Sequence, residues 1–246
     1  MNILLRWYHQ LSSPPHFYRM TGKWLPWLTW IFALLTIYGL VAGLYLAPTD
    51  YQQGESYRII YIHVPAAWMS LFIYISMAVS GVIVLVWRMK LAEVVLVSCA
   101  PIGAIFTFLA LVTGSLWGKP MWGTYWVWDA RLTSELLLLF LYLGVLGLYN
   151  AIEDKRTAAR AVSILAIVGV VNIPIIHYSV EWWNSLHQGP TVTVTGKSAM
   201  DVNMLIPLLV MSFSFKFYFA INLIQRCRAE LLDRERNSRW VKELIS

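Results

Sequence analysis

Charged residues are scarce in this chain of 246 residues, and their scarcity excludes an ordinary water-soluble domain. Asp, Glu, Lys and Arg make up 13% of the residues, whereas hydrophobic residues make up 59% and the mean hydropathy is +0.60. A soluble fold of this length needs far more charge to cover its surface. A bilayer accepts such a composition, because helices satisfy their own backbone polar groups within lipid.

Cysteine is also scarce. Cys99 lies in an apolar run and Cys227 in a basic tail, and the sequence contains no CxxC pair. We therefore expect neither a structural disulfide nor a thiol redox centre.

The sequence shows no Walker motif and no recognisable nucleophile–base pair, so we predict no catalytic residues and no conventional enzyme activity.

Six long apolar runs predict an all-α, polytopic membrane protein that forms a single membrane domain over residues 1–246. A transmembrane helix needs about 20 apolar residues. The predicted spans are residues 25–46, 64–87, 94–116, 132–149, 161–177 and 205–224. They leave outer segments at about residues 47–63, 117–131 and 178–204, and a basic tail at 225–246. Pro101 and Pro174 lie inside two spans, where proline predicts a kink.

Basic residues orient the six spans. The N-terminal segment, the two short connections on the same side and the C-terminal tail are all rich in Lys and Arg. The segments on the opposite side contain only four basic residues, Arg58, Lys119, Arg131 and Lys197. The positive-inside rule therefore places both termini in the cytoplasm. The net charge of +6 is explained by this arrangement, so we expect no nucleic-acid partner.

Tryptophans are concentrated in the outer segment between the third and fourth spans. Four of them and a tyrosine fall within twelve residues: Trp117, Trp122, Tyr125, Trp126 and Trp128. Aromatic belts at membrane interfaces also use Trp and Tyr. This density, interrupted by Gly and Pro, equally favours a surface for a flat apolar ligand.

Heme matches the chemistry of the outer segments. It is flat, bears two anionic propionates and needs axial ligands, for which histidine is common. His63 and His187 flank the tryptophans in sequence, and His177 at the outer end of the fifth span remains an alternative ligand. Arg58 and Arg131 are candidates to pair with the propionates.

The sequence WGKPMWGTYWVWDARLT, residues 117–133, resembles the tryptophan-rich WWD signature of heme-handling membrane proteins. It is most similar to the pattern of the cytochrome c maturation heme-handling protein C family (CcmC). The resemblance extends to YRIIYIHVPAAW around His63, to APIGAIFTFLALVTGSLWG before the tryptophans, and to IIHYSVEWWNSLHQG around His187. It covers most of residues 50–189.

This resemblance implies six transmembrane helices with the tryptophan-rich loop on the periplasmic side, between helices 3 and 4. It also implies that His63 and His187 are the axial ligands of heme b, so His177 is no longer the expected ligand. The family's aromatic platform and its terminal acid correspond to Trp117, Trp122, Trp126, Trp128 and Asp129.

The same resemblance implies a function in cytochrome c biogenesis at the bacterial inner membrane. Such a protein delivers heme to a periplasmic heme chaperone (CcmE-type) and promotes its covalent attachment there. The implied partners also include membrane lipid, a single-span helper (CcmD-type) and an ABC transporter pair (CcmA/CcmB-type). A transmembrane heme exporter or permease is the alternative, although few polar residues lie in the spans. Two further alternatives fit less well. Heme–cytochrome c synthetases are much longer chains than this one. An electron-transfer b-type cytochrome would place histidine pairs within the bilayer, and here only His177 is near such a position.

Overall fold

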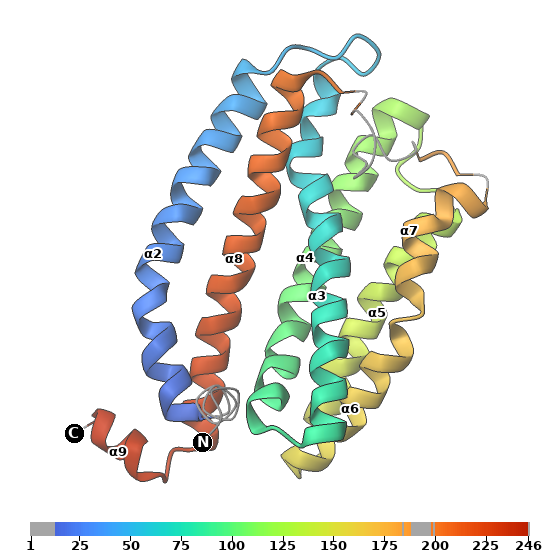
Figure 1. Cartoon of the computed structure of the whole chain (residues 1–246). Coiled ribbons are helices and arrows are strands. Elements are labelled where there is room, and N and C mark those ends of the chain that lie inside the picture. Colours follow the sequence, from blue (N-terminus) through green and yellow to red (C-terminus); the bar gives the residue numbers. More distant parts are fainter. Residues whose placement is uncertain (1–12, 184, 188–197, 199, 246) are drawn as a thin grey trace.

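The computed structural model describes residues 13–183, 185–187, 198 and 200–245. These residues form helices and connecting segments, and no strand occurs among them (Figure 1). A π-helical turn, η1 (Ala42–Leu46), extends the first helix, and a 3₁₀ turn, η2 (Glu55–Ile59), leads into the second. The α-helices are α2 (Pro14–Val41), α3 (Ile60–Trp87), α4 (Lys90–Trp122), α5 (Ala130–Ala151), α6 (Lys155–Gly169), α7 (Asn172–Trp182), α8 (Val202–Arg234) and α9 (Arg239–Ile245).

Six stretches of helix are long and apolar enough to cross a membrane, which confirms the predicted all-α fold with six spans. α6 and α7 together form one of them, Lys155–Trp182. The chain is therefore a multi-pass membrane protein. α2 begins and α8 ends at the same end of the bundle, which also bears the α3–α4 and α5–α6 connections (Figure 1). We call this the basic end.

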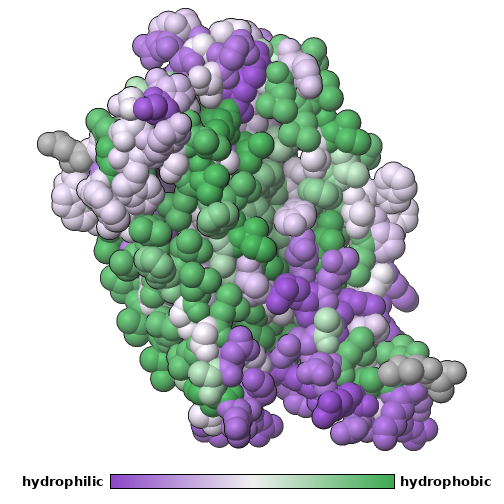
Figure 2. Space-filling model, turned by 180° about the vertical axis from the view of Figure 1, so that it is seen from behind, coloured by the Kyte–Doolittle hydropathy of each residue, from purple (hydrophilic) through white to green (hydrophobic). Residues whose placement is uncertain are grey.

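A broad apolar surface separates the two ends of the bundle. Figure 2 shows hydrophobic side chains over the middle of the molecule and hydrophilic ones at both ends, including the basic end at the bottom of the view. The large exposed apolar side chains include Trp27, Trp30, Phe108 and Phe140. In a bilayer, lipid covers side chains of this kind, so their exposure fits a membrane-spanning bundle.

Four helices form the core of the bundle. α3 packs against α4, α4 against α5, α5 against α6, and α6 against α3. Tyr74, Leu138 and Tyr142 are fully buried between them. The Tyr142 hydroxyl donates a hydrogen bond of 2.7 Å to the carbonyl of Ser70, which ties α5 to α3. α8 packs along α3 and α4, and α2 packs along α8 at the edge of the bundle.

The fifth span is interrupted, as Pro174 predicts, but the break lies before the proline, at Val170 and Val171. Pro174 has no N–H for the carbonyl of Val170, and its ring would clash with that carbonyl in a continuous helix. Ile173 donates to this carbonyl instead, at 3.0 Å. By contrast, α4 continues as one helix through Pro101.

This break determines where the bundle is open. α6 packs against both α3 and α5, whereas α7 packs against α5. α6 therefore covers α3 near the basic end, but α7 does not cover α3 in the same way at the opposite end. The space between α3, α4, α5 and α7 becomes a cavity.

Candidate functional site

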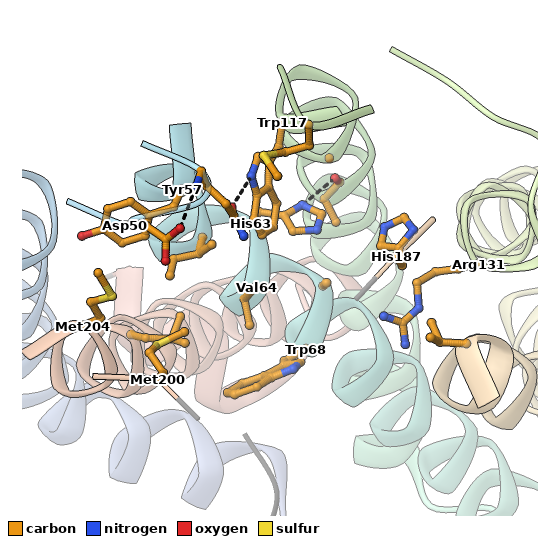
Figure 3. Close-up of a pocket in the computed structure, with 18 of the residues that line it drawn as sticks. Asp50, Tyr57, His63, Val64, Trp68, Trp117, Arg131, His187, Met200 and Met204 are labelled. Atoms are coloured by element: carbon orange, nitrogen blue, oxygen red, sulfur yellow. Dashed lines mark hydrogen bonds between the residues drawn. The ribbon is translucent and has the colours of Figure 1, made fainter. Parts of the chain in front are cut away.

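A cavity of about 880 Å³ lies at the end of the bundle opposite the basic end. Its walls come from the starts of α3, α5 and α8, the ends of α4 and α7, and the segment between α2 and α3. Cofactor sites commonly have volumes of about 300–1,000 Å³. Figure 3 shows His63 beside Trp117, and His187 beside Arg131, in this cavity. The predicted site residues that line it are His63, Trp117, Trp122, Arg131 and His187.

His63 lies in the first turn of α3, and α4 holds its ring in place. Nδ1 lies 3.0 Å from the carbonyl oxygen of Ala110 and 3.0 Å from Oγ1 of Thr113. A carbonyl oxygen only accepts hydrogen bonds, so Nδ1 must carry the proton and donate it. Thr113 itself donates to the carbonyl of Leu109 at 2.6 Å, which leaves its oxygen able to accept from the ring. Nε2 is then unprotonated, and this is the form of imidazole that binds a metal ion.

The tryptophan segment is partly helical. α4 continues to Trp122 rather than ending near Leu116, so Trp117 also lies on this helix. Gly123 ends the helix, because its φ of 77° is in the left-handed region and its N–H bonds to the carbonyl of Lys119 at 3.1 Å. The connection to α5 is therefore limited to residues 123–129.

Each of the two histidines packs against one tryptophan of α4. The rings of His63 and Trp117 have centroids 5.6 Å apart and meet edge to face. The rings of His187 and Trp122 have centroids 4.8 Å apart. Trp117 is fixed in turn, because its Nε1 donates to Oε1 of Gln53 at 3.1 Å. The cavity thus combines two imidazoles with two broad aromatic faces.

Asp129 connects α5 to the segment that contains His187. Its Oδ1 accepts a hydrogen bond of 2.8 Å from the N–H of Leu132 and caps the helix. Its Oδ2 accepts from the hydroxyl of Ser185, and that hydroxyl accepts from the backbone N–H of His187 at 3.1 Å. Nδ1 of His187 lies 3.5 Å from Oδ2 of Asp129. This contact is longer than the hydrogen bond of His63, and Nδ1 of His187 forms no hydrogen bond with the described residues. A carboxylate only accepts, so its position still favours the proton on Nδ1, which leaves Nε2 for a metal ion.

Burial lowers the pKa of His187 below its ordinary value, although the charge of Asp129 opposes the shift. The ordinary pKa of histidine is about 6.5. The folded protein therefore keeps His187 neutral as the pH falls through this value, whereas the unfolded chain takes up a proton. The contribution of His187 to stability is complete above about pH 6.5 and declines as the pH falls below it.

We expect the substitution Asp129→Asn to lower the pKa of His187 further. Asparagine can still cap α5, so the helix start is retained. The negative charge that favours the imidazolium form is removed. NMR titration of the imidazole signals of both proteins in detergent measures the effect. A pKa that rises in the variant would contradict the assigned contact.

Arg131 lies on the cavity wall in the first turn of α5. Its Nε donates to Oγ of Ser179 at 3.2 Å, and its Nη2 donates to the carbonyl of His177 at 3.3 Å. These bonds tie α5 to α7. A guanidinium has five N–H donors, so Arg131 retains donors for an anionic group in the cavity.

Four predicted site residues lie outside the cavity lining: Arg58, Trp126, Trp128 and Asp129. Arg58 donates to the carbonyls of Gly43 and Ala47 at 2.8 and 3.0 Å, and it thereby holds the end of η1. Trp126 and Trp128 contact each other, with ring centroids 5.4 Å apart. Trp128 is 77% exposed. The structure therefore divides the tryptophans into a cavity pair on α4 and a second pair before α5.

Sequence reasoning also misses some of the cavity lining. Trp68 is hard to recognise, because a tryptophan in an apolar run looks lipid-facing, and it is in fact 40% exposed while lining the cavity. Glu135 has the clearest signal, since an acidic residue inside a span costs about 2.5–3.5 kcal/mol on insertion scales. The missed residues include Gln53, Trp68, Glu135, Met200 and Met204.

Comparison with known proteins gives matches over nearly the whole chain. Residues 7–242 match the CcmC family, described as Heme exporter protein C. Heme exporter protein C of Escherichia coli (strain K12) is 54% identical over 237 residues, which are 96% of each chain. The protein of the same name from Haemophilus influenzae is 49% identical over 239 residues, 97% of each chain. A ccmC-like mitochondrial protein of Marchantia polymorpha, named for cytochrome c biosynthesis, is 48% identical over 203 residues, 82% of this chain and 85% of the relative. These matches confirm the resemblance of the tryptophan segment, and the chain belongs to the CcmC family of heme exporter C proteins.

Proposed function

We propose that this protein binds heme b in the cavity and delivers it to a periplasmic heme chaperone of the CcmE type for cytochrome c biogenesis. One observation carries the proposal: His63 and His187 line a single cavity, where Nδ1 of His63 is hydrogen-bonded to Ala110 and Nδ1 of His187 lies 3.5 Å from a carboxylate oxygen of Asp129. Their Nε2 atoms are the natural ligands for one iron. The names of the relatives, which refer to heme export, support the choice of cofactor.

The other cavity residues fit heme as well. Trp117 and Trp122 offer aromatic faces to a flat ring. Arg131 suits a propionate, because a guanidinium pairs well with a carboxylate. When bound, heme supplies the iron and the vinyl group that a chaperone modifies, and the protein binds and orients it. We expect no conventional enzyme activity from the chain itself.

The membrane orientation follows from the charges of the two ends. Arg88 lies between α3 and α4, Lys90 begins α4, and the start of α6 contains Lys155 and Arg156. The positive-inside rule assigns this basic end to the cytoplasm, with both termini. The cavity then opens at the periplasmic face of a bacterial inner membrane, where a periplasmic chaperone can reach it.

Delivery suits this bundle better than passage through it. Tyr74, Leu138 and Tyr142 are fully buried between the core helices, below the cavity toward the basic end. Such packing closes the route that a permease would need. A CcmD-type helper and a CcmA/CcmB-type transporter pair are the further partners we propose, with lipid around the bundle.

Trp128 provides the test of delivery, because it is exposed beside the cavity without lining it. We expect Trp128→Ala to bind heme normally and to reduce formation of the heme–chaperone adduct about tenfold or more, as loss of an aromatic contact at an interface does. Heme-stained gels of the purified chain with a CcmE-type chaperone measure the adduct. Trp27→Ala is the matched control, since Trp27 is 72% exposed on α2, which packs along α8 at the edge of the bundle.

Equal adduct yields from Trp128→Ala and Trp27→Ala would contradict the proposal that the chaperone docks at Trp128. If the protein were a permease, sealed vesicles with the purified chain as their only membrane protein would accumulate heme, whether or not the chaperone is added. That result would replace delivery with transport.

A further inference from the structure

Glu135 is a buried carboxylate on the cavity wall. It lies on α5, one turn deeper than Arg131, and is only 8% exposed. Its Oε1 accepts a hydrogen bond of 2.7 Å from the hydroxyl of Ser70 on α3. The carbonyl of Ser70 accepts in turn from the hydroxyl of Tyr142. The carboxylate is therefore held in one position at the floor of the cavity.

Arg131 does not neutralise this carboxylate directly. Its guanidinium bonds to Ser179 and to the carbonyl of His177, and within the described part of the chain Glu135 forms no ion pair. The hydrogen bond from Ser70 comes from a neutral hydroxyl. A buried carboxylate without a direct cationic partner is costly in a membrane, and residues of this kind mark functional sites. Such a group is either neutralised by a proton or stabilised as a carboxylate by a positive group on the ligand.

We propose that Glu135 stabilises the ferric state of heme bound in this cavity and so lowers its reduction potential. The inference rests on the proposed heme site. Ferric iron in a porphyrin dianion with two neutral imidazoles has one net positive charge on the iron–ring core, and ferrous iron has none. Burial by itself favours the neutral acid form of Glu135, whereas the positive charge of ferric heme favours its carboxylate form. Ionised Glu135 at the cavity wall therefore stabilises the ferric form, and the low dielectric of the interior strengthens this preference.

The electron balance is simple. Reduction adds one electron to the iron, supplied in the experiment by a soluble redox dye, and breaks no bond. Glu135 acts through its negative charge in the ferric state, and it is not a ligand of the iron. Its effect is therefore measured as the reduction potential of the bound heme rather than as an activity.

Glu181 is a matched comparison within the same cavity. It lines the cavity from α7, but its side chain is exposed. Water and salt screen a charge at such a position. Glu135→Gln and Glu181→Gln each remove one negative charge from the lining, and only the first removes a buried one. Glutamine at position 135 can still accept the hydrogen bond from Ser70.

Potentiometric titration of the purified heme-loaded chain tests the proposal. We expect Glu135→Gln to lower the ferric-to-ferrous ratio at a fixed potential at least tenfold, which is a rise of about 59 mV for one electron. We expect Glu181→Gln to change this ratio less than twofold. The visible spectrum should still show two histidine ligands in both variants.

An unchanged potential in Glu135→Gln, or an equal shift in Glu181→Gln, would overturn the proposal. If Glu135→Gln folds without retaining heme, titration with ferric and ferrous heme separately decides, because the proposal predicts the greater loss for the ferric form. Glu135→Met repeats the test without the hydrogen bond. If both neutral variants fail to accumulate in the membrane while Glu135→Asp folds, the role of the carboxylate is structural and the proposal is wrong. Failure of the heme site itself is distinguishable, because the unsubstituted chain would then bind no heme.

Discussion

Replacing His63 or His187 with alanine should lower heme retention at least about tenfold, because each change removes one of two axial ligands. Loss of a residue that only supports a metal ligand already costs about 10–100-fold in affinity. The heme that remains should show a five-coordinate spectrum in place of the six-coordinate, low-spin one. Heme content and the visible spectrum after purification in detergent measure both effects.

His177→Ala is the control for this experiment. His177 also lines the cavity, on α7, but its side chain is exposed and only its carbonyl contacts Arg131. We expect this variant to keep the heme content and spectrum of the unsubstituted chain. A normal spectrum in both His63→Ala and His187→Ala would contradict the ligand assignment, and a change in His177→Ala alone would move it to α7.

The substitution Gly114→Ala should weaken heme binding about 10–100-fold while leaving both histidines in the chain. A Cβ atom at this position would lie 2.9 Å from Cε1 of His63, closer than ordinary contacts allow. The hydrogen bond from Nδ1 to the carbonyl of Ala110 holds the ring against α4, so the ring has to give up this bond to move away. Titration of the purified chain with heme measures the affinity.

Gly147→Ala is the matched control, since no described residue lies within 4 Å of a Cβ atom built at Gly147 on α5. It should bind heme as the unsubstituted chain does. Equal heme affinities for the Gly114→Ala and Gly147→Ala variants would contradict the claim that heme binding requires the His63 ring in its observed position.

The fold was accessible from sequence because its cause is local. Each span is a long apolar run, and lipid forces such a run to satisfy its backbone as a helix. The break in the fifth span is also local, since Pro174 deprives the carbonyl of Val170 of its donor. At Pro101, by contrast, α4 continues as one helix.

The site was accessible only in part. His63, His187 and Arg131 were predicted as residue types that heme needs, and they do line one cavity. The two roles of the tryptophans were not separable, because the end of α4 depends on Gly123 and on contacts with distant segments. Arg58 illustrates the same limit, since its carbonyl partners are set by the path of η1.

Glu135 was missed as a cavity residue for a related reason. In sequence it follows Arg131 by one helical turn and so resembles a simple intrahelical pair. The structure sends Arg131 toward α7 and Glu135 toward Ser70 on α3. Side-chain directions at a helix start depend on which helices pack there, and a single sequence does not contain that information.

A cryo-electron microscopy structure of the chain loaded with heme b tests the central claim most directly. We expect iron between Nε2 of His63 and Nε2 of His187, with the porphyrin against Trp117 and Trp122 at the end of the bundle opposite α9. Iron bound elsewhere, or held by only one of these two histidines, would contradict it.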